Sequence, residues 1–184
     1  MRIMIKNVRL AFPAIFEPQA IGDGEPAYGA KLIVPPDHES VAEIRNAIVS
    51  VAKEKWKDKW EGVITVLKDD KRICWVEGPY KNKDGVVYDG FEGMFSLSTR
   101  SPTVRPTALG ASGQPVSKED GVIYPGCYVH ASVEFWAQDN NWGRRINCNL
   151  RGVMFAGEGQ SFGGATAAAA DEFAGLAKDV SDLF

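Results

Sequence analysis

Residues 127–155, CYVHASVEFWAQDNNWGRRINCNLRGVMF, alternate apolar and polar side chains over two runs that a polar turn separates. Successive side chains of a strand point to opposite faces, so this pattern predicts an antiparallel hairpin with one buried face. The residues predicted to be buried are Val129, Ala131, Val133, Phe135, Ala137, Ile146, Cys148, Leu150 and Met154. A slip of one residue would exchange the two faces, so the register of the hairpin is well specified.

The first third of the chain predicts two more strands and one substantial helix. Residues 3–12 and 28–35 are short apolar runs, and Pro35 and Pro36 end the second. From about residue 38 to residue 61 the apolar residues recur at helical spacing instead. Ser40 with Glu43, or else Asp37, could cap this helix, and we expect it to end at Gly62.

Strand patterns return after the helix. Asp84-Gly85 lies between two apolar runs and predicts a tight turn. Residues 101–126 are interrupted by proline and glycine and predict a long excursion with little regular structure. From Gly157 the chain is rich in glycine and alanine, so we expect a folded domain over 1–156 and a linker with a flexible acidic tail over 157–184. The fold class predicted is a mainly β barrel or sandwich with one helix.

Several functional classes have no support in the sequence. There is no long apolar run, no leader pattern and no common catalytic motif. The odd number of cysteines, Cys74, Cys127 and Cys148, favours reduced thiols in a cytoplasm. His38 and His130 are far apart in the chain. We therefore expect a non-enzymatic protein without cofactor, metal or membrane contact.

Charge is unevenly distributed along the chain. The net charge is −3, and residues 171–184 account for all of it, with four acids against Lys178. The body is therefore neutral overall, but the two stretches 94–118 and 140–157 contain basic residues and no acidic residue. A neutral body can bind an anion if its positive charges are segregated.

Aromatic residues interleaved with basic and amide residues give the richest functional signal. Binding single-stranded nucleic acid requires a positive groove for the phosphates and flat rings for the bases. One group of candidate DNA-binding residues is Tyr80, Lys81, Lys83 and Tyr88, and the hairpin supplies Trp136, Trp142, Arg144, Arg145, Asn147, Asn149 and Arg151. Trp142 lies in a polar turn, where it either stacks on a base or folds back as a plug between the two strands.

The stretches KNVRLAFPAIFEP, GEPAYGAKLIVP, YDGFEGMFSLSTRSPTVRP, IYPGCYVHASVEFWA and GQSFGG follow one another from near the start to about residue 164. In their order and spacing, the chain resembles the single-stranded DNA-binding protein family of tailed bacteriophages and prophages. The resemblance implies an OB-fold, a small and strongly bent barrel, that binds unpaired DNA in replication, recombination or repair. It implies a place in the bacterial host cytoplasm.

In that fold the hairpin between the last two strands borders the DNA groove, which would place Trp142, Arg144 and Arg145 there. Arg100 and Arg105 lie in the matching STRSPTVRP stretch and are further candidates. Two rival functions stay open at this point: a phage structural or assembly protein, and a DNA-processing enzyme. A homodimer is compatible with a strand-rich body, whose sheet edges are free to pair.

The last residues, DEFAGLAKDVSDLF, combine acids with apolar side chains. We expect Asp179, Asp182, Leu183 and Phe184 to bind replication or recombination proteins, with the acids competing for the DNA groove until DNA displaces them. The alternative is a short helix docked on the body, since Phe173, Leu176, Val180 and Leu183 have near-helical spacing.

Overall fold

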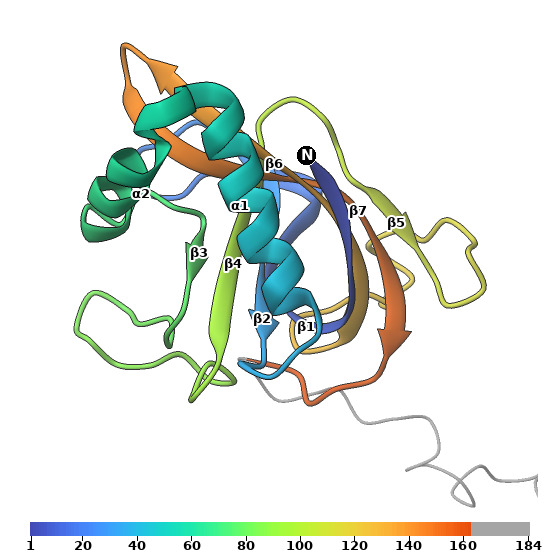
Figure 1. Ribbon diagram of the computed structural model, residues 1–184. Coiled ribbons are helices and arrows are strands. Elements are labelled where there is room, and N and C mark those ends of the chain that lie inside the picture. The colour runs from blue at the N-terminus through green and yellow to red at the C-terminus, as the bar shows by residue number, and fades with distance from the viewer. Residues whose placement is uncertain (163–184) are drawn as a thin grey trace, which may run out of the picture.

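The computed structural model describes residues 1–162, and β-strands dominate it (Figure 1). The strands are β1 Arg2–Gln19, β2 Ala27–Val34, β3 Trp75–Val76, β4 Phe95–Ser101, β5 Thr107–Leu109, β6 Tyr128–Asn140 and β7 Gly143–Gly157. They form one sheet in the order β3-β4-β2-β1-β6-β7-β5. All neighbours are antiparallel except β5 and β7.

The sheet curls until β4 and β7 meet. The Ser101 hydroxyl donates a hydrogen bond of 2.9 Å to the Leu150 carbonyl, and the Cys74 N–H donates one of 3.0 Å to the Ile146 carbonyl. The long strand β1 follows this curvature, pairing first with β6 and then with β2. The expected mainly β, OB-fold-like barrel with one substantial helical region is confirmed.

The helical region extends beyond its expected end. It comprises α1 Ser40–Trp56, a 3₁₀ turn Lys57–Lys59 and α2 Trp60–Asp69. The prediction that Gly62 ends the helix is wrong, because Val63 and Leu67 lie beyond it and are buried against the core. The predicted caps are also wrong: Glu39 occupies the cap position without a side-chain hydrogen bond, and the Ser40 N–H bonds to His38 Nδ1.

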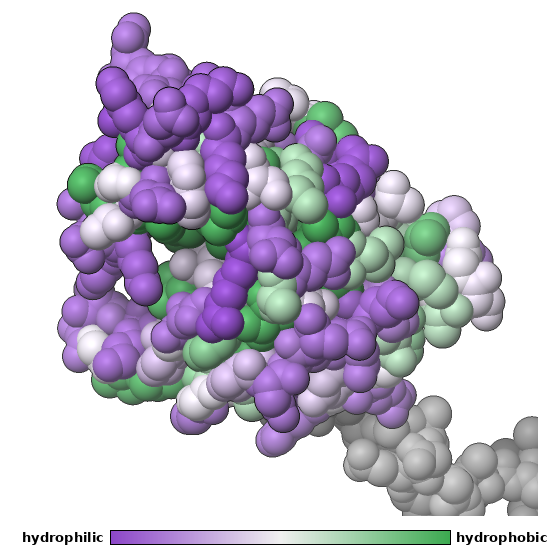
Figure 2. Space-filling view, in the orientation of Figure 1, coloured by the Kyte–Doolittle hydropathy of each residue, from purple (hydrophilic) through white to green (hydrophobic). Residues whose placement is uncertain are grey.

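Helix α1 lies across one face of the barrel (Figure 1), and its last residue, Trp56, donates from Nε1 to Asp139 near the tip of the β6–β7 hairpin. The buried side of α1 consists of Ser40, Val41, Ile44, Ala47, Ile48, Val51, Ala52 and Trp56. Hydrophilic side chains cover most of the outer side of α1 (Figure 2), whereas Val66 of α2 is an exposed hydrophobic residue. The core therefore lies between α1 and the inner face of the barrel.

The hairpin has the predicted faces over most of its length. The expected inner residues of β6 from Val129 to Phe135 are buried, as are Ile146, Cys148 and Leu150 of β7. Met154 is a wrong prediction, because a bulge at Arg151 shifts the register between the pairs Ser132–Gly152 and Val133–Leu150. Beyond the bulge Val153 points inward instead.

The connecting segments contain little regular structure, as predicted. After β4 ends at Ser101, the short strand β5 is the one strand before residue 126. Around Asp84-Gly85 the backbone turns tightly, with a bridge between Lys81 and Val87. After β7 the chain still contacts the body, since the Phe162 N–H donates to the Pro125 carbonyl at 3.0 Å. The division at residue 157 stays a prediction.

Within residues 1–162 no helix has the length and apolar character needed to cross a bilayer. In the same part of the chain no group of three or more histidine, cysteine, aspartate or glutamate side chains is arranged to hold a metal ion.

Candidate nucleic-acid interface

The outer side of the hairpin presents the predicted aromatic and amide residues together. Trp136 lies on β6 opposite Asn147 and is 40% exposed. The Trp136 Nε1–H donates to Asn149 Oδ1 at 3.1 Å, and Asn147 Nδ2 donates to Gln138 Oε1 at the same distance. Arg145 is exposed beside them, opposite Gln138. We call Trp136, Arg145, Asn147 and Asn149 the hairpin face.

Trp142 occupies the tip of the hairpin and is 85% exposed. The turn around it is fixed by the Asn140 side chain, whose Oδ1 accepts the Trp142 N–H at 2.9 Å, and by Gly143 at a positive φ of 93°. A ring this exposed is not packed between two strands. The plug interpretation is therefore wrong, and the indole is free to meet a ligand.

Arg144 and Arg145 do not lie on one face, because neighbouring residues of a strand point in opposite directions. Arg144 Nε is 3.1 Å from Asp139 Oδ2 on the helix side of the hairpin. Asp139 also accepts the Trp56 Nε1–H at 2.8 Å, and this hydrogen bond is the main cause that lowers the pKa of Asp139. Arg144 and Arg72 line a hollow beside α2, away from the hairpin face.

Arg151, at the bulge, is held by an acid. Its guanidinium forms an ion pair with Glu134 and donates from Nε to Oε2 at 2.6 Å, and Arg2 approaches the same oxygen at 3.7 Å. The hydrogen bond from Arg151 is the largest cause that lowers the pKa of Glu134. Much of the charge on Arg151 is therefore already compensated within the protein.

A second aromatic group forms at the segment 77–94, where Tyr80 and Tyr88 were predicted. Their rings stack with centroids 5.1 Å apart, and Phe12 of β1 meets Tyr88 edge-on at 5.1 Å. Phe91 lies beneath, 5.5 Å from Tyr80 and fully buried. We call Phe12, Tyr80, Tyr88 and Phe91 the aromatic cradle.

Lys31 supplies the charge of the cradle. Its Nζ lies 3.8 Å from the centre of the Tyr80 ring and donates to Ser98 Oγ at 2.6 Å. Burial lowers the pKa of Lys31 to about 8. Sequence reasoning missed both Lys31 and Phe12, although a single lysine inside the apolar run YGAKLIVP was a usable signal.

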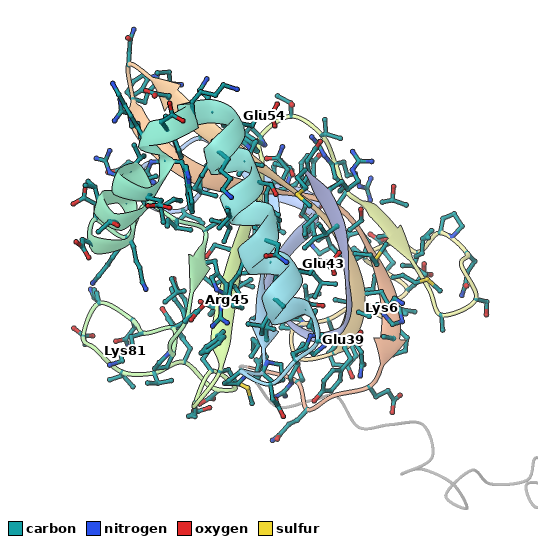
Figure 3. The ribbon with its side chains drawn as sticks, viewed as in Figure 1. Lys6, Glu39, Glu43, Arg45, Glu54 and Lys81 are labelled. Carbon is teal, nitrogen blue, oxygen red and sulfur yellow. The ribbon has the colours of Figure 1, made fainter. Side chains whose placement is uncertain are left out.

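The base of the 77–94 segment is fixed to the helix. Arg45 of α1 makes a two-pronged contact with Glu77, at 2.7 and 2.8 Å, and Trp75 Nε1 also donates to Glu77. The hydrogen bonds from Arg45, ahead of other causes, lower the pKa of Glu77 to about 2. Lys81 and Lys83 are both exposed. Figure 3 shows Lys81 on the loop that follows β3.

Arg100 and Arg105 lie near the end of β1 and the loop that follows it. Arg100 Nη2 donates to the Glu25 carbonyl at 2.9 Å, and the Arg105 guanidinium lies 5.9 Å from the Phe16 ring centre. Both side chains are exposed. The predicted residues thus form three groups: the hairpin, the cradle segment and the β1–β2 end.

Comparison with known proteins decides between the open functions. The family model described as "Enterobacter phage Enc34, ssDNA-binding protein" matches residues 1–184. The chain belongs to this phage single-stranded DNA-binding protein family. A putative protein p50 of Acyrthosiphon pisum secondary endosymbiont phage 1 is 37% identical over 177 residues, covering 94% of this chain and 92% of that protein.

Solved structures agree with the family. The single-stranded DNA-binding protein of bacteriophage Enc34 in complex with single-stranded DNA has a TM-score of 0.71 and 27% identity, over 88% of this chain and 89% of that one. The bacteriophage T7 single-stranded DNA-binding protein gp2.5 is 12% identical, with a TM-score of 0.57 over 98% and 96% of the two chains, and it supports the fold alone.

The resemblance seen in the sequence is therefore confirmed, and the family is one of non-catalytic, single-stranded DNA-binding phage proteins. The two rival functions, a structural protein and a DNA-processing enzyme, are set aside by this membership. Which side chains contact DNA stays a prediction.

Proposed function

We propose that this chain holds unpaired DNA on the hairpin face, the Trp142 tip and the aromatic cradle, without regard to base sequence. Stacking on aromatic rings contributes about 1–3 kcal/mol per base and tolerates every base, because each base has a flat face. The observation that carries the proposal is the exposed Trp142 indole at the end of a well-paired hairpin.

Phosphates would be met by the exposed cations near these rings. Arg145, Lys81, Lys83, Arg100 and Arg105 have exposed side chains. Arg144 and Arg151 could contribute only by sharing or leaving their carboxylate partners Asp139 and Glu134. We therefore rank Arg145 above Arg144 and Arg151 as a phosphate contact.

The proposed action is passive. Bound DNA is kept extended, is prevented from re-annealing and is shielded from nucleases, as replication, recombination or repair of phage DNA requires. We place this action in the cytoplasm of the bacterial host. Strands β3 and β5 are the two edges of the sheet and would be the positions for pairing in a homodimer.

The predicted partner-binding residues Asp179, Asp182, Leu183 and Phe184 lie outside the described residues. We propose that the acids keep this segment in water and near basic surfaces, and that the apolar residues bind replication or recombination proteins once DNA is bound.

The test is Trp142→Ala, measured with a labelled oligo-dT by fluorescence anisotropy. We predict that binding weakens by about 1–3 kcal/mol and that the melting temperature stays nearly unchanged, because an exposed ring stabilises the fold little. Trp142→Phe keeps a flat ring and should keep most of the affinity. Unchanged binding in Trp142→Ala would remove the hairpin tip from the interface.

A further inference from the structure

Phe12 has a backbone conformation that its side chain disfavours. Its φ is +49°, in the left-handed region, which is an outlier for a bulky residue and costs free energy. It lies at an irregularity of β1, between the pairs Ala11–Lys31 and Ala14–Gly29. Phe12 is nevertheless 50% exposed, so core packing alone does not account for the strain.

The exposed side of Phe12 opens into a hollow of about 440 Å³. The lining residues are Ala11, Phe12, Asn82, Val86, Val87, Tyr88, Asp89, Phe91, Pro125 and Phe162. Aromatic rings from β1, the 77–94 segment and the stretch after β7 therefore meet around one opening. Asn82 and Asp89 are the polar residues among them.

Cations back the rings of this site. Lys31 lies against Tyr80, which stacks on Tyr88. The Arg9 guanidinium lies 4.1 Å from the centre of the Phe162 ring, and Arg9 is tied by Nε to the Gly126 carbonyl at 3.0 Å. The Phe162 ring also packs directly on Gly90, where a Cβ would come within 2.4 Å of it. Aromatic walls with positive charge behind them match a flat, uncharged ring attached to a phosphate chain.

We propose that this hollow is a subsite for a nucleobase of the bound single strand, in which Phe12 is held in its strained conformation to form one wall. The proposal rests on the proposed function, because it assigns one stacking position within that DNA path. Lys31 and Arg9 then provide the positive charge for the neighbouring phosphates.

Phe12→Gly tests the subsite, because glycine adopts φ +49° without strain and removes the ring. Binding to oligo-dT should fall about 5- to 150-fold, the range that the loss of one stacked base produces. Binding to an abasic oligonucleotide of the same length, which has phosphates and sugars but no bases, should change less than 2-fold (about 0.4 kcal/mol). The melting temperature should stay level or rise. Phe12→Asn, which also tolerates this φ, should behave in the same way.

Two controls make the outcomes distinct. Asn7→Gly replaces another residue of β1 with a positive φ, of 53°, and removes no ring, so its DNA affinity should match the parent.

Trp142→Ala reports on the hairpin. If Trp142→Ala weakens binding and Phe12→Gly does not, the subsite is wrong, and single-strand binding on the hairpin still stands. If neither variant changes binding, both fail. A Phe12→Gly protein that melts much lower but binds oligo-dT normally when folded would show that the ring is only a packing residue.

Discussion

Lys31 is the residue whose environment departs most from that of an ordinary surface lysine. It lies in β2 beneath Tyr80 and bonds to Ser98, and burial lowers its pKa from 10.5 to about 8. Folding therefore removes a proton from this group at a pH between those two values. Burying the Lys31 ammonium costs free energy, and this group lies against the aromatic cradle. That position agrees with the proposal that Lys31 provides positive charge for the bound DNA.

The sign of the pH dependence follows from that direction. Between about pH 8 and 9.5 the unfolded chain binds more protons at Lys31 than the folded chain, so the free energy of unfolding should rise with pH. Nearer pH 10 Tyr80 opposes the trend, because burial raises its pKa and the folded state then holds the extra proton. Urea unfolding across pH 7 to 9.5 measures the effect, with Lys31→Met as the comparison. A rise of equal size in Lys31→Met would contradict the assignment to Lys31.

Gly62 lies inside α2, although the sequence pattern predicted that the helix ends at this residue. It lies exposed inside α2, and nothing lies within 4 Å of the position a Cβ would take. Glycine inside a helix costs about 0.5–1 kcal/mol relative to alanine, so Gly62→Ala should raise the free energy of unfolding by about that amount.

Gly29→Ala is the opposite control, since a Cβ there would lie 2.2 Å from the Thr99 carbonyl oxygen on β4 and should destabilise the sheet. Denaturant unfolding should give a higher free energy of unfolding for Gly62→Ala and a lower one for Gly29→Ala. Destabilisation by Gly62→Ala would mean that this position requires glycine after all.

The hairpin shows what alternation can predict at the scale of elements. Its inner face was predicted from Val129 to Leu150, because side-chain direction in a regular strand depends only on sequence position. The error at Met154 arises from the bulge at Arg151. After Leu150 the alternation ends in Gly152 and a run of apolar residues, so the pattern there does not decide which residue points inward. The opposite directions of Arg144 and Arg145 follow from the same periodicity, so the sequence contained that information.

The cradle could be predicted only in part for a different reason. Tyr80 and Tyr88 were selected for their spacing with lysines in one segment. Phe12, Lys31 and Phe162 come from β1, β2 and the stretch after β7, and only the curled sheet brings them together. Local pattern contains no record of such contacts between distant parts of a chain.

At the scale of the whole molecule, charge separates the body from residues 171–184, which hold the entire net charge of −3. An acidic segment tethered to a DNA-binding body has a high effective concentration at its basic surfaces. Deleting residues 171–184 should therefore tighten binding to single-stranded DNA at low salt and abolish partner recruitment, with the melting temperature unchanged. A truncated chain that melts much lower would instead support the docked-helix alternative.

The central claim is sequence-independent binding of single strands through stacked bases and a limited number of phosphate contacts. Its most direct test is a titration of the parent protein and of Arg145→Ala with oligo-dT across a salt series, with duplex DNA of the same length in parallel. We predict much tighter binding to the single strand and a log–log salt slope of about −0.7 per phosphate contacted. In Arg145→Ala the slope should become shallower by roughly one contact or less. Equal affinity for duplex and single strand, with the same slope in both proteins, would contradict the account.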